Sequence, residues 1–265
     1  LVFDNATVQR GAYSIKFSRD NDGNIIDDGT VDAINFTYKI AKADARDLNA
    51  TSTEKDVTVT NSSNINTTRD INITSEKGAV NITNNGSLNG KNNVNVTAYK
   101  TVTFGKQGAA DVTIDDTAKL VAGNNMNITS TGGDINAEKT TMPTLTYGNR
   151  LAFNAKGDNN FTSEDSLKSV NVDYKAGGAN KFYTRGDIQF VNSTLEAPNN
   201  FVESGHDVIL NGLTVKKATE NANDTVTQIF ANGNVTTDDV TGTAQADANA
   251  AVKKFPQSVS TDRTG

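Results

Sequence analysis

The residues of this chain that could perform acid–base chemistry are few. The one histidine, His206, is followed by Asp207, and adjacent acidic pairs occur at residues 115–116 and 238–239. A pair of facing carboxylates can transfer protons and so hydrolyse a glycosidic bond. Both pairs lie in turn-like surroundings, however, where two adjacent side chains do not face each other. The acidic pairs therefore give little support to catalysis.

The tetrapeptide S-G-H-D at residues 204–207 resembles the S-G-H-G motif of polygalacturonases, which are β-helical enzymes. That family also carries N-T-D, G-D-D and R-I-K motifs, and none of the three occurs in this sequence. A lone histidine at the start of a strand is then expected to be a solvated or capping residue. We therefore expect no enzyme activity, no catalytic residue, no cofactor and no metal site, with a polysaccharide-acting enzyme as an alternative.

A second motif, Arg185-Gly186-Asp187, lies where a turn should lead into a strand at residues 187–191. An exposed R-G-D tripeptide presents a guanidinium and a carboxylate at the spacing that integrins recognise. Gly-Asp is also the ordinary strand opening of this chain, as at residues 133–134. The tripeptide is thus a candidate cell-attachment motif, and the alternative is that it only forms the turn that opens a strand.

Sequons of the form N-x-S/T recur along the chain, and each asparagine could carry a glycan if it is exposed. An outward asparagine followed two residues later by an outward threonine is also what strand alternation demands. Glycosylation therefore remains a hypothesis for these positions. The candidate acceptors are Asn72, Asn81, Asn95 and Asn127.

The elements that would position these motifs repeat one short phrase in which every second residue is apolar. In the stretch 69–83, for example, Ile71 and Ile73 alternate with Asn72 and Thr74. Side chains alternate sides along a strand, so we expect the isoleucines to point into a core and the polar residues to point outward. The copies span 56–60, 70–74, 79–83, 93–97, 111–115 and 125–129, with degenerate copies at 169–173, 187–191 and 207–211.

The spacing of these strands indicates a solenoid. From Val57 through Ile71 to Val80, intervals of about 14 and about 9 residues alternate, so every second strand recurs after about 23 residues. Such a period is typical of one coil with two or three short strands, and stacked coils would align their apolar residues in columns. We predict an all-β fold, a right-handed parallel β-helix (β-solenoid). The alternative is a β-sandwich, which should show tight hairpins and an aromatic-rich core.

The chain is expected to have three parts. Residues 1–55 carry a hairpin pattern and should form an N-terminal β-rich cap or adjoining region. Residues 56–242 should form the β-helix coils, regular to about residue 142 and irregular with longer loops after it, where phenylalanines replace the Ile and Val columns. Residues 243–265 should form a helical or mobile C-terminal tail.

Composition narrows the function classes. Only 35% of the 265 residues are hydrophobic, which favours a thin, elongated core. The net charge of −6 argues against nucleic acid as a partner, and the absence of cysteine removes disulfides and thiolate chemistry. No apolar run approaches the roughly 20 residues of a membrane span. Because the chain begins with Leu1, we expect it to be a piece of a larger protein.

The coils also resemble a known family. The runs at residues 90–97, 123–137 and 205–211, such as G-K-N-N-V-N-V-T, resemble the coils of filamentous-haemagglutinin-like exoproteins, the large passengers of two-partner secretion and autotransporter systems. The resemblance implies an adhesin displayed at or released from the bacterial cell surface. It also implies a host-cell or bacterial surface receptor and an outer-membrane transporter as partners. The alternative within this family is the stalk of a secreted toxin.

Overall fold

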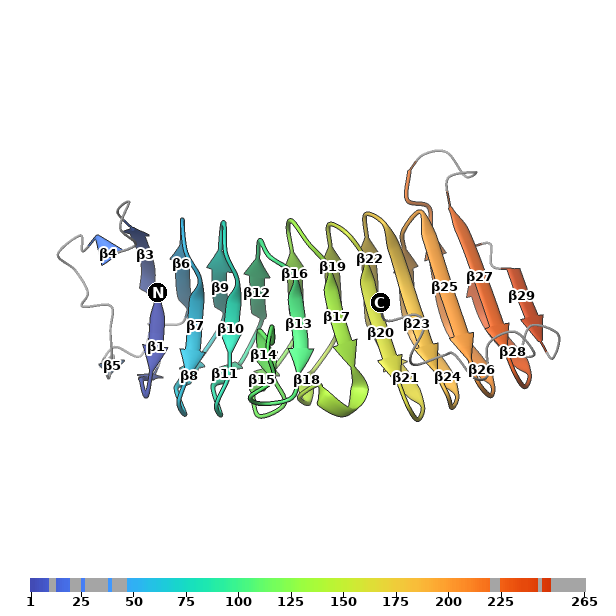
Figure 1. Ribbon diagram of the computed structural model, residues 1–265, viewed down its shortest axis with the longest axis horizontal. Helices are drawn as coiled ribbons and strands as arrows, with labels where there is room; N and C mark the ends of the chain where they lie inside the picture. The colour runs from blue at the N-terminus through green and yellow to red at the C-terminus, as the bar shows by residue number, and fades with distance from the viewer. Residues whose placement is uncertain are drawn as a thin grey trace. The chain divides into compact units, whose positions relative to one another are not determined.

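The computed structural model describes residues 1–9, 13–19, 25–26, 38–39, 47–219, 225–242 and 245–248. These residues form strands and one short 3-10 helix, η1 (Lys139–Thr141), with no α-helix among them. Almost all neighbouring strands are parallel and come from successive coils (Figure 1). This arrangement is a parallel β-solenoid and confirms the predicted all-β fold; its right-handed winding stays a prediction. No helix among the described residues is long and apolar enough to cross a membrane.

The chain divides into two compact units, each with its own stack of coils. The first unit comprises residues 1–133 and 141–151, and the second comprises residues 134–140 and 152–265. The division falls near residue 142, where the sequence predicts that the regular rhythm ends.

The first unit contains three sheets, one along each side of its coils, and they are parallel apart from one short antiparallel pair near the N-terminus. Corresponding strands of successive coils pair in register, as Val57 pairs with Val80. The first sheet contains β1 (Val2–Asp4), β7 (Val57–Thr60), β10 (Val80–Ile82), β14 (Ile114–Asp115) and β13 (Val102–Gly105). The second contains β18 (Leu145–Tyr147), β15 (Lys119–Ala122), β11 (Ser87–Gly90), β8 (Asn64–Thr67), β2 (Thr7–Gln9) and β5 (Tyr38–Lys39). The third contains β16 (Met126–Ser130), β12 (Val94–Ala98), β9 (Ile71–Ser75), β6 (Leu48–Ser52), β3 (Tyr13–Arg19) and β4 (Ile25–Ile26).

Alternation along these strands produces the expected inner columns. Ile71, Val94 and Met126 lie directly above one another, and all three are fully buried. Burial of such side chains stabilises each coil by roughly 1.5–3 kcal/mol per residue. The core of the unit is therefore a narrow stack of aliphatic columns.

The outward residues between them form a column of their own. The side-chain amide of Asn72 donates to Oδ1 of Asn49 at 2.7 Å, and Asn95 donates to Asn72 at the same distance. Asn127 extends the ladder by donating to Asn95 at 2.7 Å. The outer face is thus also bonded from coil to coil.

Asparagines also make a corner in three coils of the first unit. Asn5, Asn61 and Asn84 adopt positive φ angles of 50°, 50° and 48°. Asparagine tolerates this left-handed backbone better than other non-glycine residues, because its side chain bonds locally. The asparagine-rich turns of the sequence therefore have a conformational reason.

The solenoid begins before the expected boundary at residue 56. Strand β1 pairs with β7, β2 with β8 and β3 with β6, all in parallel, so the first residues belong to the stacked coils and not to a separate cap. Strand β3 also pairs antiparallel with the short strand β4, which joins Ser18 to Ile26. The D-G turn of the expected hairpin, at residues 22–23, lies outside the described residues.

The second unit contains longer strands, and two of its successive coil steps are shorter than the 23-residue steps of the first unit. Asn159 and Asn180 are equivalent positions of neighbouring coils 21 residues apart, and Asn180 and Asn200 are 20 residues apart. One sheet contains β17 (Ile135–Glu138), β20 (Asn159–Ser163), β23 (Ala179–Thr184), β25 (Asn199–Ser204), β27 (Val226–Ala231) and β29 (Gln245–Ala248). The other contains β28 (Val235–Thr241), β26 (Val208–Lys216), β24 (Ile188–Glu196), β22 (Val172–Ala176) and β19 (Leu151–Ala155), with β21 (Leu167–Val170) paired to β24.

Aromatic rings fill the core of the second unit, as the sequence predicts. Phe161 packs against Phe182 with ring centroids 5.8 Å apart, and Phe182 meets Phe190 edge-on at 5.0 Å. Beside the rings runs a fully buried amide ladder, in which Asn159 donates to Asn180 and Asn180 donates to Asn200, each at 2.9 Å. The ladder gives these buried amides hydrogen-bond partners, except for Oδ1 of Asn159 at its end, which has none among the described residues.

The C-terminal tail differs from its expected form. Residues 245–248 form strand β29, which pairs in parallel with β27, where composition predicted helix. A sheet edge that offers an unpaired ladder overrides helix propensity. The remainder of the expected tail, residues 249–265, lies outside the described residues.

Candidate binding site

The structure brings the R-G-D motif and the lone histidine together at neighbouring turns of the second unit. Nδ1 of His206 lies 2.5 Å from Oδ1 of Asp187, and the Asp207 amide donates to the same oxygen at 3.0 Å. Arg185 is paired with Glu164 through its Nε. The side chains of His206 and Asp187 are 65% and 42% exposed, so these charged groups stay accessible to solvent.

These contacts shift two pKa values in opposite directions. The hydrogen bond from the Asp207 amide, and after it that from His206, lowers the pKa of Asp187. The hydrogen bond to Asp187, and after it the charges of Asp207 and Asp187, raises the pKa of His206. Each shift favours the charged form, so the two side chains form an ion pair over a wider pH range than isolated residues would.

A repeated turn explains why the sequence places these residues here. Asp187 accepts from the amide of Asp207, which accepts in turn from the amide of Asn234 at 2.8 Å. Asp70 receives the amide of Asn93 in the same way in the first unit. The aspartates that open these strands are therefore rungs of a ladder that joins successive turns.

The S-G-H-D tetrapeptide has an equally structural role. Oγ of Ser204 accepts the His206 amide at 3.0 Å and contacts the carbonyl oxygen of Asp207 at 2.9 Å. Ser163 fixes the corresponding turn of another coil in the same way, because its Oγ accepts the Asp165 amide and contacts the Ser166 carbonyl oxygen, both at 3.1 Å. The likeness to the polygalacturonase motif therefore follows from a turn that this chain uses repeatedly.

Asp187, His206 and Asp207 could in principle hold a metal ion, since their ligand atoms lie within 4.8 Å of one another. The Oδ1 atoms of both aspartates already accept backbone amides, as described above. A cation would compete with those bonds and with the ring of His206. We therefore interpret the three residues as an ion pair that stabilises the turn.

The candidate glycan acceptors lie in the side-chain ladders. Asn72 and Asn95 each donate to one neighbouring coil and accept from the next, and all four acceptors are half-buried. Asn81 donates its amide to Thr58 Oγ1 at 3.2 Å. A glycan on any of these amides would leave it one N–H, and that N–H is needed for the coil-to-coil hydrogen bond, which disfavours modification in the folded chain.

The pair at residues 115–116 holds an inserted segment, residues 106–115, in place. Asp115 is buried, and its Oδ2 accepts the amide of Asn84 at 2.9 Å, whereas the exposed Asp116 accepts the amide of Gln107 at 3.0 Å. The two carboxylates thus act on different backbone groups. Residues 238–239 lie on the exposed strand β28, where Asp239 has a φ of 53°.

One strand of the predicted repeat is wrong, because it falls in this inserted segment. The phrase at residues 111–115 was expected to form a regular strand of a coil, but only Ile114 and Asp115 are strand, as β14. The regular strand of this coil is β13, at residues 102–105. Strand β14 turns back and lies between β10 and β13, pairing with Ile82 on one side and with Phe104 on the other.

This wedge separates two coils of the first unit and opens a hollow of about 610 Å³. At one end the coils still meet, because the amides of Tyr99 and Lys100 both donate to the carbonyl oxygen of Gly78 at 3.0 Å. At the other end the Ile82 amide donates to Thr113. Between these points no described strand pairing joins β10 to β13. The hollow is lined by Ala79, Asn81, Lys100, Thr101, Thr103, Asp111, Val112, Thr113, Gly132 and Gly133.

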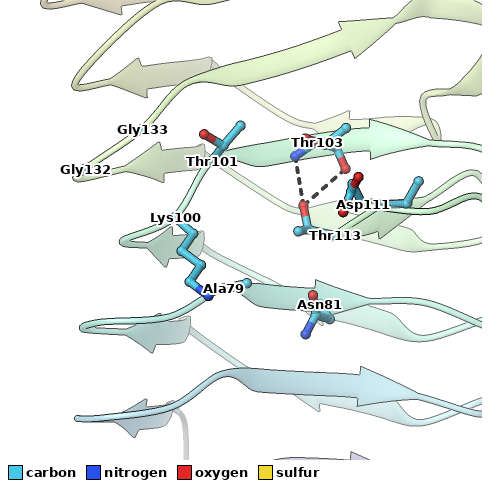
Figure 2. Close-up of a pocket in the computed structure, with 10 residues that line it drawn as sticks. Ala79, Asn81, Lys100, Thr101, Thr103, Asp111, Thr113, Gly132 and Gly133 are labelled. Carbon is cyan, nitrogen blue, oxygen red and sulfur yellow. Dashed lines mark hydrogen bonds between the residues drawn. The ribbon is translucent and has the colours of Figure 1, made fainter.

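Figure 2 shows how the polar groups are distributed around this hollow. The Lys100 side chain extends toward Ala79 at one side, and Asp111 lies beside Thr113 at the other. Thr113 is fixed by its Oγ1, which accepts the Thr103 amide at 2.8 Å and donates to the Thr103 carbonyl oxygen at 3.1 Å. The lining therefore offers an ammonium group, a carboxylate, an amide and hydroxyl groups around one opening.

Sequence reasoning missed this hollow because the inserted segment imitates the repeat. From Val112 through Met126 to Ile135 the intervals are again about 14 and about 9 residues. The available signal was the coil length: Asn95 and Asn127 of neighbouring coils are 32 residues apart, although Asn72 and Asn95 are 23 residues apart.

Comparison of the chain with known protein families, curated proteins and solved structures finds no match.

Proposed function

We propose that this chain is a segment of a secreted or surface-displayed bacterial adhesin, exported through an outer-membrane transporter. Its coils would form a rigid scaffold whose outer surface attaches to a receptor on a host or bacterial cell. Its role is then structural and interactive, without catalysis.

The observation that carries this proposal is the bonding of the coils to one another on both their inner and outer faces. Inner columns such as Ile71 and Val94 exclude water, while the ladder through Asn72 and Asn95 fixes the outward side chains. A stack of this kind is rigid without disulfides, and it can form coil by coil as a chain emerges from a pore. Departures from the regular coil, such as the hollow, then stand on a fixed frame.

The R-G-D turn is a second candidate for attachment. Arg185 and Asp187 are engaged in exposed ion pairs, which contribute little to stability and can be displaced by a receptor. The substitution Asp187→Glu keeps the charge but changes its reach. If the motif binds a receptor, this variant attaches less than the parent chain, whereas Asp165→Glu, at an exposed residue of the same unit, attaches equally.

Attachment itself is tested with fluorescent beads that carry the purified chain. We expect several-fold more beads on cultured epithelial cells or on bacterial cells than with albumin-coated beads. Equal numbers on every cell type tested would contradict an attachment function.

A further inference from the structure

The hollow beside the wedge strand β14 points to a specific ligand class. We infer that it is a binding site for an uncharged saccharide of about disaccharide size. This inference rests on the proposed attachment function, since it supplies the kind of ligand that an attachment surface would recognise.

The size and shape of the hollow suit a small ligand. Its volume of about 610 Å³ falls within the range of roughly 300–1,000 Å³ that is usual for small-molecule sites. Because one strand is inserted between β10 and β13, the gap is wider than normal strand spacing by about 4.8 Å. The structure therefore holds open a shallow slot that faces solvent.

The ends of the slot argue against an extended peptide. Peptides that add a strand to a sheet need an edge that continues past the site. Here the Gly78 carbonyl oxygen binds the next coil at one end, and the pairing of Ile82 with Ile114 closes the other. An extended chain could not run through the slot, whereas a short ring-shaped ligand could enter it from outside.

The lining has the chemistry that sugar hydroxyls require. A hydroxyl both donates and accepts a hydrogen bond, and a carboxylate such as Asp111 can accept from two neighbouring hydroxyls. The Lys100 ammonium only donates, while Asn81 and Thr101 can do both. The one cationic and the one acidic side chain of the lining balance each other, which favours an uncharged ligand.

An aromatic ring lies against one residue of the lining. Tyr99 is 49% exposed, although it is a large apolar side chain, and its ring lies against Gly132 of the lining. A Cβ atom at Gly132 would come within 2.5 Å of that ring, so glycine is what allows the ring to lie flat over the turn. An exposed ring face beside polar groups is suited to the C–H face of a sugar.

The test is isothermal titration calorimetry on the full chain with lactose, maltose, cellobiose and N,N′-diacetylchitobiose. We expect at least one to bind with a dissociation constant of about 1 mM or tighter. Asp111→Asn and Lys100→Met should each weaken that binding by about tenfold or more. Asparagine tolerates the positive φ of 60° at position 111, so the first variant should keep the fold, which circular dichroism would verify. Lys119→Met, an exposed lysine on a different sheet, is the control and should bind as the parent does.

The inference is overturned if no saccharide binds, if Asp111→Asn binds as tightly as the parent, or if an uncharged β-strand peptide binds at this site in place of the sugars. Bead attachment, measured in parallel, separates this outcome from failure of the proposed function. If beads attach to cells but no saccharide binds, the saccharide inference is wrong and the attachment function stands. If a saccharide binds but the beads attach to no cell, the saccharide site stands and the attachment function is wrong.

Discussion

At the scale of single residues, the polar side chains that look chemically active in the sequence act as structural rungs. Asp187 and Asp207 bind the amides of the turns that follow them, and Ser204 fixes the turn between them. Their types and spacing are those of a repeated turn, because every coil must satisfy the same backbone groups. A sequence shows the residue types but not which groups already occupy their hydrogen bonds.

The ion pair of His206 with Asp187 makes stability depend on pH. The raised pKa of His206 means that its contribution is present below its ordinary value of 6.5 and is lost as pH rises through the raised value. The lowered pKa of Asp187 means that its contribution is present above 3.8 and is lost as pH falls through the lowered value. His206→Gln should therefore lower the melting temperature most between about pH 4 and pH 6.5.

Melting curves of the two proteins from pH 3 to pH 9 measure this difference. At high pH the curves should converge, because the imidazole is neutral in both the folded and unfolded chains. A gap that stays constant over the whole range would show that the pair does not titrate as described. Since His206 is the one histidine, its pKa can also be read directly from the proton NMR spectrum.

The buried amide ladder of the second unit can be tested with a matched pair. Asn180 donates to Asn200 and to the Tyr174 carbonyl oxygen and accepts from Asn159. Asn180→Ala should lower the free energy of unfolding by about 2–4 kcal/mol, since it leaves buried partners unsatisfied. Asn160→Ala removes a half-buried outward rung and should cost about 0.5–1.5 kcal/mol.

Chemical denaturation of both variants gives the comparison. Similar losses for the inward and the outward asparagine would contradict the assignment of the ladder to the core.

At the scale of elements, alternation in the sequence predicts the regular strands well. The columns through Ile71, Val94 and Met126 follow from period-two patterning alone. Two features could not be predicted in this way. The first is the wedge β14, which has the same alternation as a coil strand and differs only in its pairing partners. The second is the buried amide ladder, because Asn159 and Asn180 look like outward residues in the sequence although both are fully buried.

Deletion of residues 106–115 tests the role of the wedge. The coil that runs from Leu88 to its partner Leu120 contains this segment, and its removal brings β13 to the place that β14 occupies. We expect β10 to pair directly with β13 and the hollow to close. The Val80 amide lies on the same side of β10 as the Ile82 amide, which bonds to the next coil. In the deletion variant the Val80 amide should therefore bond to β13 and exchange with solvent at least tenfold more slowly.

Hydrogen exchange measured by NMR gives this result residue by residue. The Val57 amide, which donates to the Ala79 carbonyl oxygen on the other side of β10, is the internal reference and should keep its rate. An unchanged rate at Val80 would show that the wedge does not hold the coils apart.

At the scale of the whole molecule, composition and fold belong together. A chain with 35% hydrophobic residues cannot fill a wide core, and the solenoid needs only narrow columns. The polar majority is used on the outside, where amides and carboxylates bond along each stack. Fold class therefore followed from the sequence, whereas the hollow depends on how one irregular coil pairs.

The measurement that tests attachment by the folded coils most directly is competition. Chain-coated beads are allowed to attach to cells in the presence of excess soluble chain, either the parent or Ile71→Asp. Ile71 is fully buried between Leu48 and Val94, so a charge there should unfold the surrounding coils. We predict that the parent chain reduces attachment several-fold and that Ile71→Asp does not. Equal competition by both chains, or by neither, would contradict attachment through the folded solenoid.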